Sequence, residues 1–167
     1  MASIKIATLN CRGLMSPAKR RRLNLYVKQH RVDILLLQET HVADNSLMTE
    51  IANEWGMRGY WSLGSYQSKG VAILFKLSLN VTYNCHFRDS DGRLVVVNMK
   101  MGDENFRLIN IYAPNKARER YNFFKAVEDR LHAPGIRVLV AGDFNCVEDA
   151  SLDRVTTPGN RTVFYDI

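Results

Sequence analysis

Four short apolar segments of this chain each end in a polar side chain that can do chemistry. The segments span 4–9, 34–38, 108–111 and 138–142, and short, largely apolar runs bounded by loop residues predict buried strands. Ligand sites gather at strand ends in such sheets, because a rigid scaffold there meets open loops. The residues at these ends are Asn10, Glu39, Tyr112, and Asp143 with Asn145. We therefore expect one polar site assembled from segments that are distant in the sequence.

The spacing of apolar residues predicts alternating helices and strands. Helices are expected from Ser16 and Pro17 through Val27, from Asn45 and Ser46 to about Glu54, and over 118–131. Strands are expected over 4–10, 32–38, 70–76, 79–88, 93–101, 106–112 and 136–141, with hairpin connections at 91–92 and 102–105. Helical crossovers at both ends of a strand meander indicate an α/β sandwich with mixed sheets. The final stretch, 148–167, is polar and irregular.

Length and charge narrow the class of protein. The 167 residues suit a single domain. A net charge of +6 favours an anionic partner, nucleic acid ahead of a membrane, although a simply basic soluble protein is an equal alternative. The three cysteines form no C-x-x-C pair, which argues for a reducing compartment and against a zinc cluster. Without a signal-like or membrane-length apolar run, we expect an intracellular domain that has no membrane partner and no small-molecule cofactor.

Glu39 and the segment from Asp143 to Asn145 carry the expected acidic chemistry. A carboxylate at the end of a buried strand, as at Glu39, suits a hard cation such as Mg²⁺, with an acid facing solvent as an equal alternative. Extended backbone places Asp143 and Asn145 on one side and turns Phe144 into the core. Asp143 can then orient or deprotonate water and Asn145 can hold a phosphate oxygen, whereas an Asx-type turn is the structural alternative.

Tyr112 and Asn10 add neutral polar groups to this site. The Tyr112 phenol can donate a hydrogen bond to a phosphate or to developing charge, and Pro114 would fix the following loop. Asn10 can position a metal or a phosphate. Structural alternatives remain for both residues, because tyrosine is common at strand ends and asparagine near glycine favours turns.

A basic cluster lies near the start of the first predicted helix and consists of Lys19, Arg20, Arg21 and Arg22. Cations there oppose the helix dipole, a cost that phosphate contacts would offset, and a solvated helix face is the alternative. His41, two residues after Glu39, is expected to face the same site. Cys11 and Cys146 each follow a site residue, and strand alternation predicts that both are small core side chains.

In this order, these segments resemble the endonuclease/exonuclease/phosphatase superfamily. More closely, the chain is similar to the apurinic-endonuclease-like endonuclease domain of LINE-type non-LTR retrotransposons. The resemblance is carried by residues 8–14 (TLNCRGL), Pro17 with the basic run to Leu23, 38–41 (QETH), 69–74 (KGVAIL), 109–115 (INIYAPN), 142–145 (GDFN) and 152–154 (LDR). The joint match extends through nearly the whole chain and is specific.

This resemblance implies a DNase I-like, four-layer α/β sandwich with two mixed β-sheets. It also implies Mg²⁺-dependent phosphodiester hydrolysis, with Mn²⁺ as an alternative ion. In the retrotransposon branch such a domain nicks target DNA and leaves a 3′-hydroxyl that primes reverse transcription. A nuclear location and a reverse transcriptase domain in the parent polypeptide follow as expectations.

The resemblance also implies roles for individual residues. Glu39 is expected to be the main metal ligand, and Asn10 to position the metal or the phosphate. Tyr112 would contact the scissile phosphate, while Asp143 and Asn145 would orient water and stabilise the transition state. The residues expected to approach DNA are Asn115, Lys19, Arg20, Arg21, Arg22 and His41.

The sequence departs from the family pattern in one respect. That pattern ends with a Ser-Asp-His-type motif several dozen residues beyond Gly-Asp-Phe-Asn, and its histidine contacts the phosphate. This sequence contains no Asp-His dipeptide. Residues 1–167 are therefore expected to form the N-terminal two-thirds of a single domain, incomplete at its C-terminal side. Impaired cleavage is expected, because catalytic groups act as a unit.

Two alternatives to a DNA-nicking enzyme remain open at this point. One is a phosphatase or phospholipase of the same superfamily. The basic cluster and the segment 112–115 favour DNA as the substrate over the substrates of those enzymes. The other is a non-catalytic nucleic-acid-binding remnant. A remnant would bind DNA with a steep salt dependence and show no magnesium-dependent turnover.

Overall fold

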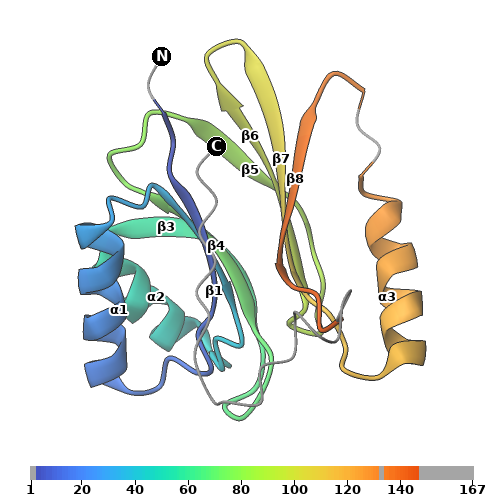
Figure 1. Cartoon of the computed structure of the whole chain (residues 1–167). Helices are drawn as coiled ribbons and strands as arrows, with labels where there is room; N and C mark the ends of the chain where they lie inside the picture. Colours follow the sequence, from blue (N-terminus) through green and yellow to red (C-terminus); the bar gives the residue numbers. More distant parts are fainter. Residues whose placement is uncertain (1–2, 132–133, 147–167) are drawn as a thin grey trace, which may run out of the picture.

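The computed structural model describes residues 3–131 and 134–146 (Figure 1). Two four-stranded sheets face each other; helices α1 and α2 cover the outer side of one sheet, and helix α3 covers the other. The predicted four-layer sandwich with two mixed sheets is therefore confirmed. The motif at 152–154 and the polar stretch 148–167 lie outside the described residues. No helix of the described part is long and apolar enough to span a membrane.

The first sheet has the strand order β1-β2-β4-β3. Strands β1 and β2 run parallel, and β4 is antiparallel to both β2 and β3. The strands are β1 (Ile6–Asn10), β2 (Ile34–Gln38), β3 (Met57–Ser62) and β4 (Val71–Lys76). Helix α1 (Pro17–Gln29) connects β1 to β2, and helix α2 (Asn45–Trp55) leads into β3.

The second sheet has the order β5-β6-β7-β8. Strands β5 to β7 form an antiparallel meander, and helix α3 (Ala117–Glu128) makes the crossover that places β8 parallel to β7. The strands are β5 (Thr82–Arg88), β6 (Leu94–Met101), β7 (Glu104–Tyr112) and β8 (Arg137–Asp143). Each sheet thus carries one parallel pair at an edge, β1 with β2 in the first sheet and β7 with β8 in the second.

Strand β2 shows why its sequence is continuously apolar. All five of its residues are buried. Leu35 and Leu37 pack into the cluster beneath α1 and α2, whereas Ile34 and Leu36 pack into the core between the two sheets. Because side chains alternate across a strand, a strand covered on both faces needs apolar residues at every position.

Strand β3 was not predicted from the sequence, where the strand pattern was recognised only after Tyr60. Helix α2 ends at Gly56, which takes the left-handed conformation with φ 64°, and β3 begins at the next residue. Gly59 then lies against β4 so closely that an added Cβ would be 1.8 Å from the Ile73 carbonyl oxygen. This glycine serves the close approach of two strands, a role that depends on the neighbouring strand.

Smaller corrections concern the ends of elements. Asp44 caps helix α2 by accepting a hydrogen bond from the Leu47 amide at 2.8 Å, so the predicted cap at Asn45 and Ser46 is wrong by one residue. Helix α3 ends at Glu128, earlier than predicted, and β8 extends to Asp143. Such shifts are typical of element boundaries.

The two parallel strand pairs bring the predicted site together. In the first sheet Asn10 pairs with Gln38, the residue before Glu39. In the second sheet Tyr112 pairs with Asp143. Parallel strands end at the same edge of a sheet, and the two sheets face each other, so these ends meet at one end of the sandwich.

Candidate active site

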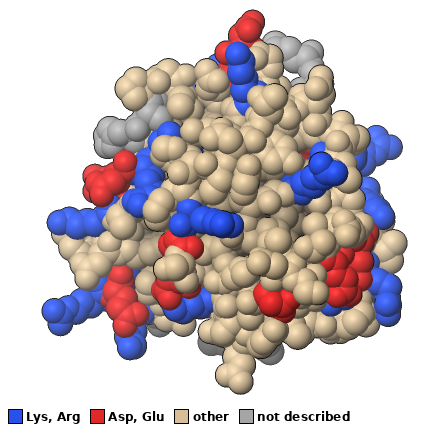
Figure 2. Space-filling view, turned by 180° about the vertical axis from the view of Figure 1, so that it is seen from behind, with Lys and Arg blue, Asp and Glu red and all other residues tan. Residues whose placement is uncertain are grey.

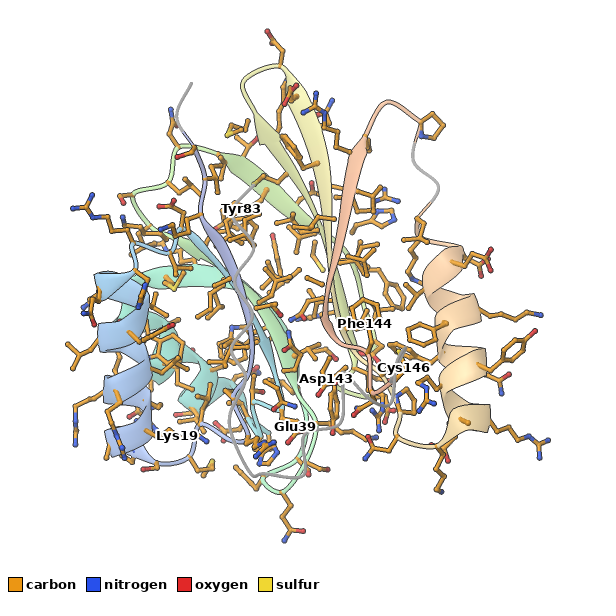
Figure 3. The ribbon with its side chains drawn as sticks, in the orientation of Figure 1. Lys19, Glu39, Tyr83, Asp143, Phe144 and Cys146 are labelled. Atoms are coloured by element: carbon orange, nitrogen blue, oxygen red, sulfur yellow. The ribbon has the colours of Figure 1, made fainter. Side chains whose placement is uncertain are left out.

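The side-chain amide of Asn10 joins the two carboxylates of the predicted site. Its Nδ2 donates to Glu39 Oε1 at 2.9 Å and to Asp143 Oδ2 at 2.8 Å. Figure 3 shows Glu39 and Asp143 at the same end of the sandwich, approaching from opposite sheets. Residues that are 29 and 133 positions from Asn10 in the sequence thus form one cluster.

Tyr112 contributes a protonated phenol to this cluster. Burial, and then the interaction of its hydroxyl with the Glu39 carboxylate, raise the pKa of Tyr112 from 10.0 to about 12. As in an ordinary tyrosine, the phenol is protonated at neutral pH and is available as a hydrogen-bond donor.

The loop after β8 is tied to the end of β7. The Asn145 amide nitrogen donates to Asp143 Oδ1 at 3.0 Å, and its side-chain Nδ2 donates to the Ala113 carbonyl at 2.7 Å. The Ala113 amide in turn donates to the Asp143 carbonyl at 2.8 Å. The Asx-type turn considered above is thus present, while Asp143 Oδ2 remains directed to Asn10. The turn and the site coexist because the carboxylate has two oxygens.

Phe144 and Cys146 are both more exposed than predicted. Phe144 does lie on the opposite side of the strand from Asp143, as alternation predicts, but there it stacks on Phe124 of α3 and is 38% exposed instead of entering the core. Asn145 adopts φ 47°, so the extended backbone ends at this residue and alternation no longer applies to Cys146. Cys146 is exposed, which makes the prediction of a core side chain wrong, whereas the same prediction for Cys11 is confirmed.

The two carboxylates leave a negative charge that a cation can neutralise. Within residues 3–131 and 134–146, the only ion-pair partner of either is His41, whose Nε2 lies 3.7 Å from Glu39 Oε2. The same part of the chain holds no group of three or more His, Cys, Asp or Glu suited to a metal. Mg²⁺ is commonly held by one or two carboxylates together with water and substrate phosphate. Glu39 and Asp143 fit that pattern.

The basic cluster divides into residues with different environments. Arg20 is 2% exposed, and its guanidinium pairs with Glu50 and Glu54 of helix α2. The prediction that Arg20 contacts DNA is therefore corrected to a structural role. Lys19 Nζ donates to the Arg12 carbonyl at 2.8 Å, and Figure 3 places Lys19 at the end of α1 nearer Glu39. Arg21 and Arg22 are the exposed residues of the cluster.

Asn115 follows Tyr112 by three residues, and Arg93 contacts Tyr112 directly. Asn115 is exposed in the loop after β7, and its carbonyl accepts a hydrogen bond from Arg120 at 2.9 Å. Arg93 was missed by sequence reasoning, because the preceding Asp91 and Gly92 were read only as a turn. Its Nη1 donates to the Tyr112 carbonyl at 3.0 Å, and its Cζ lies 5.0 Å from the centre of the Tyr112 ring. Arg93 therefore stabilises the position of Tyr112 through its backbone and its ring.

Gln38 and Asn110 were also missed. Both are polar residues inside apolar strands, and they are 1% and 0% exposed. Their position within continuous apolar runs was the available signal, because a polar side chain buried at such a place needs specific partners.

The fold and this cluster define the class of protein. The chain belongs to the endonuclease/exonuclease/phosphatase family, whose model matches residues 7–163. DNA repair nuclease APEX1 of Danio rerio is 32% identical over 176 residues, covering 96% of this chain and 54% of that protein. The transposon TX1 uncharacterized 149 kDa protein of Xenopus laevis is 27% identical over 150 residues, covering 89% of this chain and 11% of that protein.

A solved structure supports the fold assignment. The endonuclease domain of TRAS1, a telomere-specific non-LTR retrotransposon, superposes with a TM-score of 0.65 at 18% identity. The match covers 88% of this chain and 63% of that domain. The chain thus spans about half, or less, of the curated relatives named above.

Proposed function

We propose that this chain is a metal-dependent nuclease domain of retrotransposon type that nicks DNA. The observation that carries the proposal is the cluster in which Asn10 joins the carboxylates of Glu39 and Asp143, with the Tyr112 hydroxyl beside Glu39. A relative that is 32% identical is a DNA repair nuclease, and another belongs to a transposon. We extend the proposal to a nuclear location and to a parent polypeptide that includes a reverse transcriptase.

Each residue of the cluster has a role in phosphodiester hydrolysis under this proposal. Glu39, with Asn10 beside it, would hold Mg²⁺ or Mn²⁺. When bound, the cation supplies charge neutralisation at the phosphate and lowers the pKa of a water molecule. Asp143 Oδ2 orients the attacking water and accepts its proton. The protonated phenol of Tyr112 would donate to a non-bridging oxygen of the phosphate.

The amides of Asn10 and Asn145 hold these groups in place. Asn10 keeps the two carboxylates within reach of one donor, which limits their mutual repulsion. Asn145 uses its side-chain amide to bind the Ala113 carbonyl, and a second N–H of the same NH₂ group can donate to phosphate. Proximity of this kind lowers the barrier, because the reacting groups need not be ordered during the reaction.

We place the DNA across the end of the sandwich where the strands terminate. Exposed Asn115 borders the site there, and Lys19 lies at the same end of α1. His41 lies beside Glu39, so it would contact the DNA only at the phosphate group that is nearest the cation. The face in Figure 2 shows basic and acidic side chains interspersed around a largely uncharged centre. Such a mixed face attracts a polyanion less than a basic one does.

Relaxation of supercoiled plasmid by the purified chain tests the proposal. We expect nicking with Mg²⁺ and none with EDTA. Glu39→Gln and Asp143→Asn keep the side-chain shape and remove one negative charge each, so we expect the rate to fall about 100-fold or more. Glu104→Gln, which removes an exposed carboxylate at the β6–β7 hairpin, is the matched control and should nick like the wild type.

Three outcomes would contradict the proposal in different ways. Unchanged nicking by Glu39→Gln and Asp143→Asn would show that the site is assigned wrongly. Salt-dependent DNA binding by a folded chain without any turnover would indicate a nucleic-acid-binding protein. Turnover of inositol phosphates or sphingomyelin in place of plasmid would indicate a phosphatase or a phospholipase.

A further inference from the structure

Asn110 links the two sheets of the sandwich through its side chain. It lies on β7 and is 0% exposed. Its Nδ2 donates across the core to the carbonyls of Leu37 on β2 and Ala72 on β4, each at 2.8 Å. Its Oδ1 accepts a hydrogen bond from Gln38 Nε2 at 2.6 Å. We call these three hydrogen bonds the cross-sheet amide link.

The link attaches to the first sheet where its strand pairing becomes irregular. The ladder between β2 and β4 is regular as far as the pair of Leu37 and Ala72. Hydrogen bonding resumes where the Thr40 amide donates to the Gly70 carbonyl at 3.0 Å. Gln38 and Glu39 therefore lie opposite the single residue Val71. Two residues against one is the arrangement of a β-bulge, which redirects a side chain.

Glu39 is the residue that this bulge redirects. It adopts φ 51°, a left-handed conformation that costs energy for a residue with a side chain. Such a conformation persists only where the surrounding contacts determine it. The carbonyls that Asn110 binds belong to the last regular pair before Glu39, and Gln38, which also binds Asn110, directly precedes it.

The same link sets the position of Tyr112. Asn110 and Tyr112 are two residues apart on β7, so their side chains leave the strand on the same side. Asn110 reaches the backbone of β2 and β4, and Tyr112 reaches the carboxylate of Glu39. The link therefore lies next to the site: Asn110 is two residues before Tyr112, and its partner Leu37 is two residues before Glu39. It joins the strand that carries Tyr112 to the strand that leads to Glu39.

We propose that Asn110 is a positioning residue for the nuclease reaction, whose cross-sheet amide link holds the bulge at Glu39 in register with Tyr112. This inference rests on the proposed function. An apolar side chain of similar size could fill the same volume, but it could not fix the two sheets relative to each other by directional bonds. The link thus supplies orientation, which apolar packing alone does not.

Asn110→Leu tests the proposal, with Leu108→Ala as the matched control. Leu108 lies on β7 two residues before Asn110, is 1% exposed and belongs to the same core between the sheets. Both changes should lower the melting temperature. We expect Asn110→Leu to reduce kcat for plasmid nicking about 10- to 100-fold with KM changed less than about threefold, because small misplacements of reacting groups are costly. Leu108→Ala should keep kcat within about threefold.

A second measurement needs no activity. In the metal-free protein, NMR should show displaced backbone amide signals of Glu39 and Thr40 in Asn110→Leu and unchanged signals in Leu108→Ala. Gln38→Met, which keeps the length of the side chain and both Asn110 donors, should show a smaller displacement and carries the test if Asn110→Leu does not fold.

The outcomes separate this inference from the proposed function. Equal loss of kcat in Asn110→Leu and Leu108→Ala, or undisturbed Glu39 signals in Asn110→Leu and Gln38→Met, would overturn the positioning role. A wild-type chain that fails to nick DNA would overturn the proposed function, and the NMR comparison would still decide whether Asn110 orients Glu39.

Discussion

Two cysteines follow residues of the candidate site and lie in opposite environments. Cys11, after Asn10, is 4% exposed, and its Sγ donates to the Gln38 carbonyl at 3.2 Å. Burial raises the pKa of its thiol from 9.0 to about 12. Cys146, three residues after Asp143, is exposed. Residues that look alike in the sequence therefore differ in reactivity, because only a thiolate that is accessible reacts quickly.

We expect iodoacetamide to modify Cys146 in the folded chain and to leave Cys11 unmodified. With a pKa of about 12, only about one Cys11 thiol in 10⁴ is ionised at pH 8, and raising the pH to 9 still leaves almost all of it protonated. Mass spectrometry of the labelled peptides measures both sites, and unfolding in denaturant should make Cys11 reactive. Equal labelling of the two cysteines in the folded chain would contradict this structure.

At the scale of elements, Arg20 fastens helix α1 to helix α2. Its Nη2 lies 2.5 Å from Glu50 Oε1, and its Nε lies 3.1 Å from Glu54 Oε2. Its Nη1 also donates to the Leu14 carbonyl at 3.2 Å. The hydrogen bond from Arg20 holds the pKa of Glu54 below its ordinary 4.5. This contribution to stability is complete above pH 4.5, and it is lost as the pH falls through the lowered pKa of Glu54 in the folded chain.

We expect Arg20→Met to lower the free energy of unfolding by about 1–3 kcal/mol at pH 7. Breaking a fully buried pair costs more, but Glu50 and Glu54 are 55% and 35% exposed, so water screens them. The difference from the wild type should shrink between about pH 5 and pH 3. Urea unfolding measures it.

Arg21→Met is the matched control, because Arg21 is the exposed neighbour on the same helix. It should change stability by less than about 0.5 kcal/mol. It should also reduce the salt dependence of DNA binding, which Arg20→Met should not. The opposite pattern would show that Arg20, and not Arg21, faces the DNA.

At the scale of the whole molecule, the sandwich presents edge strands on neighbouring sides. In the described part of the chain β1 pairs only with β2, and β8 pairs only with β7. Strands β1 and β8 lie next to each other across the two sheets (Figure 1). No residue of β8 is fully buried although its sequence is largely apolar, and Val138 is 36% exposed. An apolar edge of this kind can pair with another chain.

We expect Val138→Lys to reduce concentration-dependent self-association of the chain, because a charged residue on an edge strand opposes pairing. Leu77→Lys is the matched control: Leu77 is 56% exposed, lies directly after β4 and receives the same charge away from β8. Sedimentation velocity of the wild type and both variants measures the effect. An equal reduction in both would mean that added charge, and not the edge of β8, controls association.

Patterns within short segments predicted most of the fold and the core of the candidate site. Strands β2 and β4 are largely apolar runs, and the predicted ranges 32–38 and 70–76 agree closely with the observed Ile34–Gln38 and Val71–Lys76. Strand β3 escaped prediction because Gly59 matters only through its contact with β4. The cap at Asp44 was missed for a different reason, because Asp44, Asn45 and Ser46 all suit the start of a helix.

Local apolar patterning sets where strands run and stop, so the amino-acid sequence was enough to predict that several buried strands end in polar side chains. The packing of the elements against one another, by contrast, makes Arg20 turn inward, Phe144 stack on Phe124 of α3 and Asn110 cross between the sheets. These outcomes depend on what lies opposite each side chain. The partners of Asn110 are 38 to 73 residues away, and no local pattern specifies a hydrogen bond across that separation.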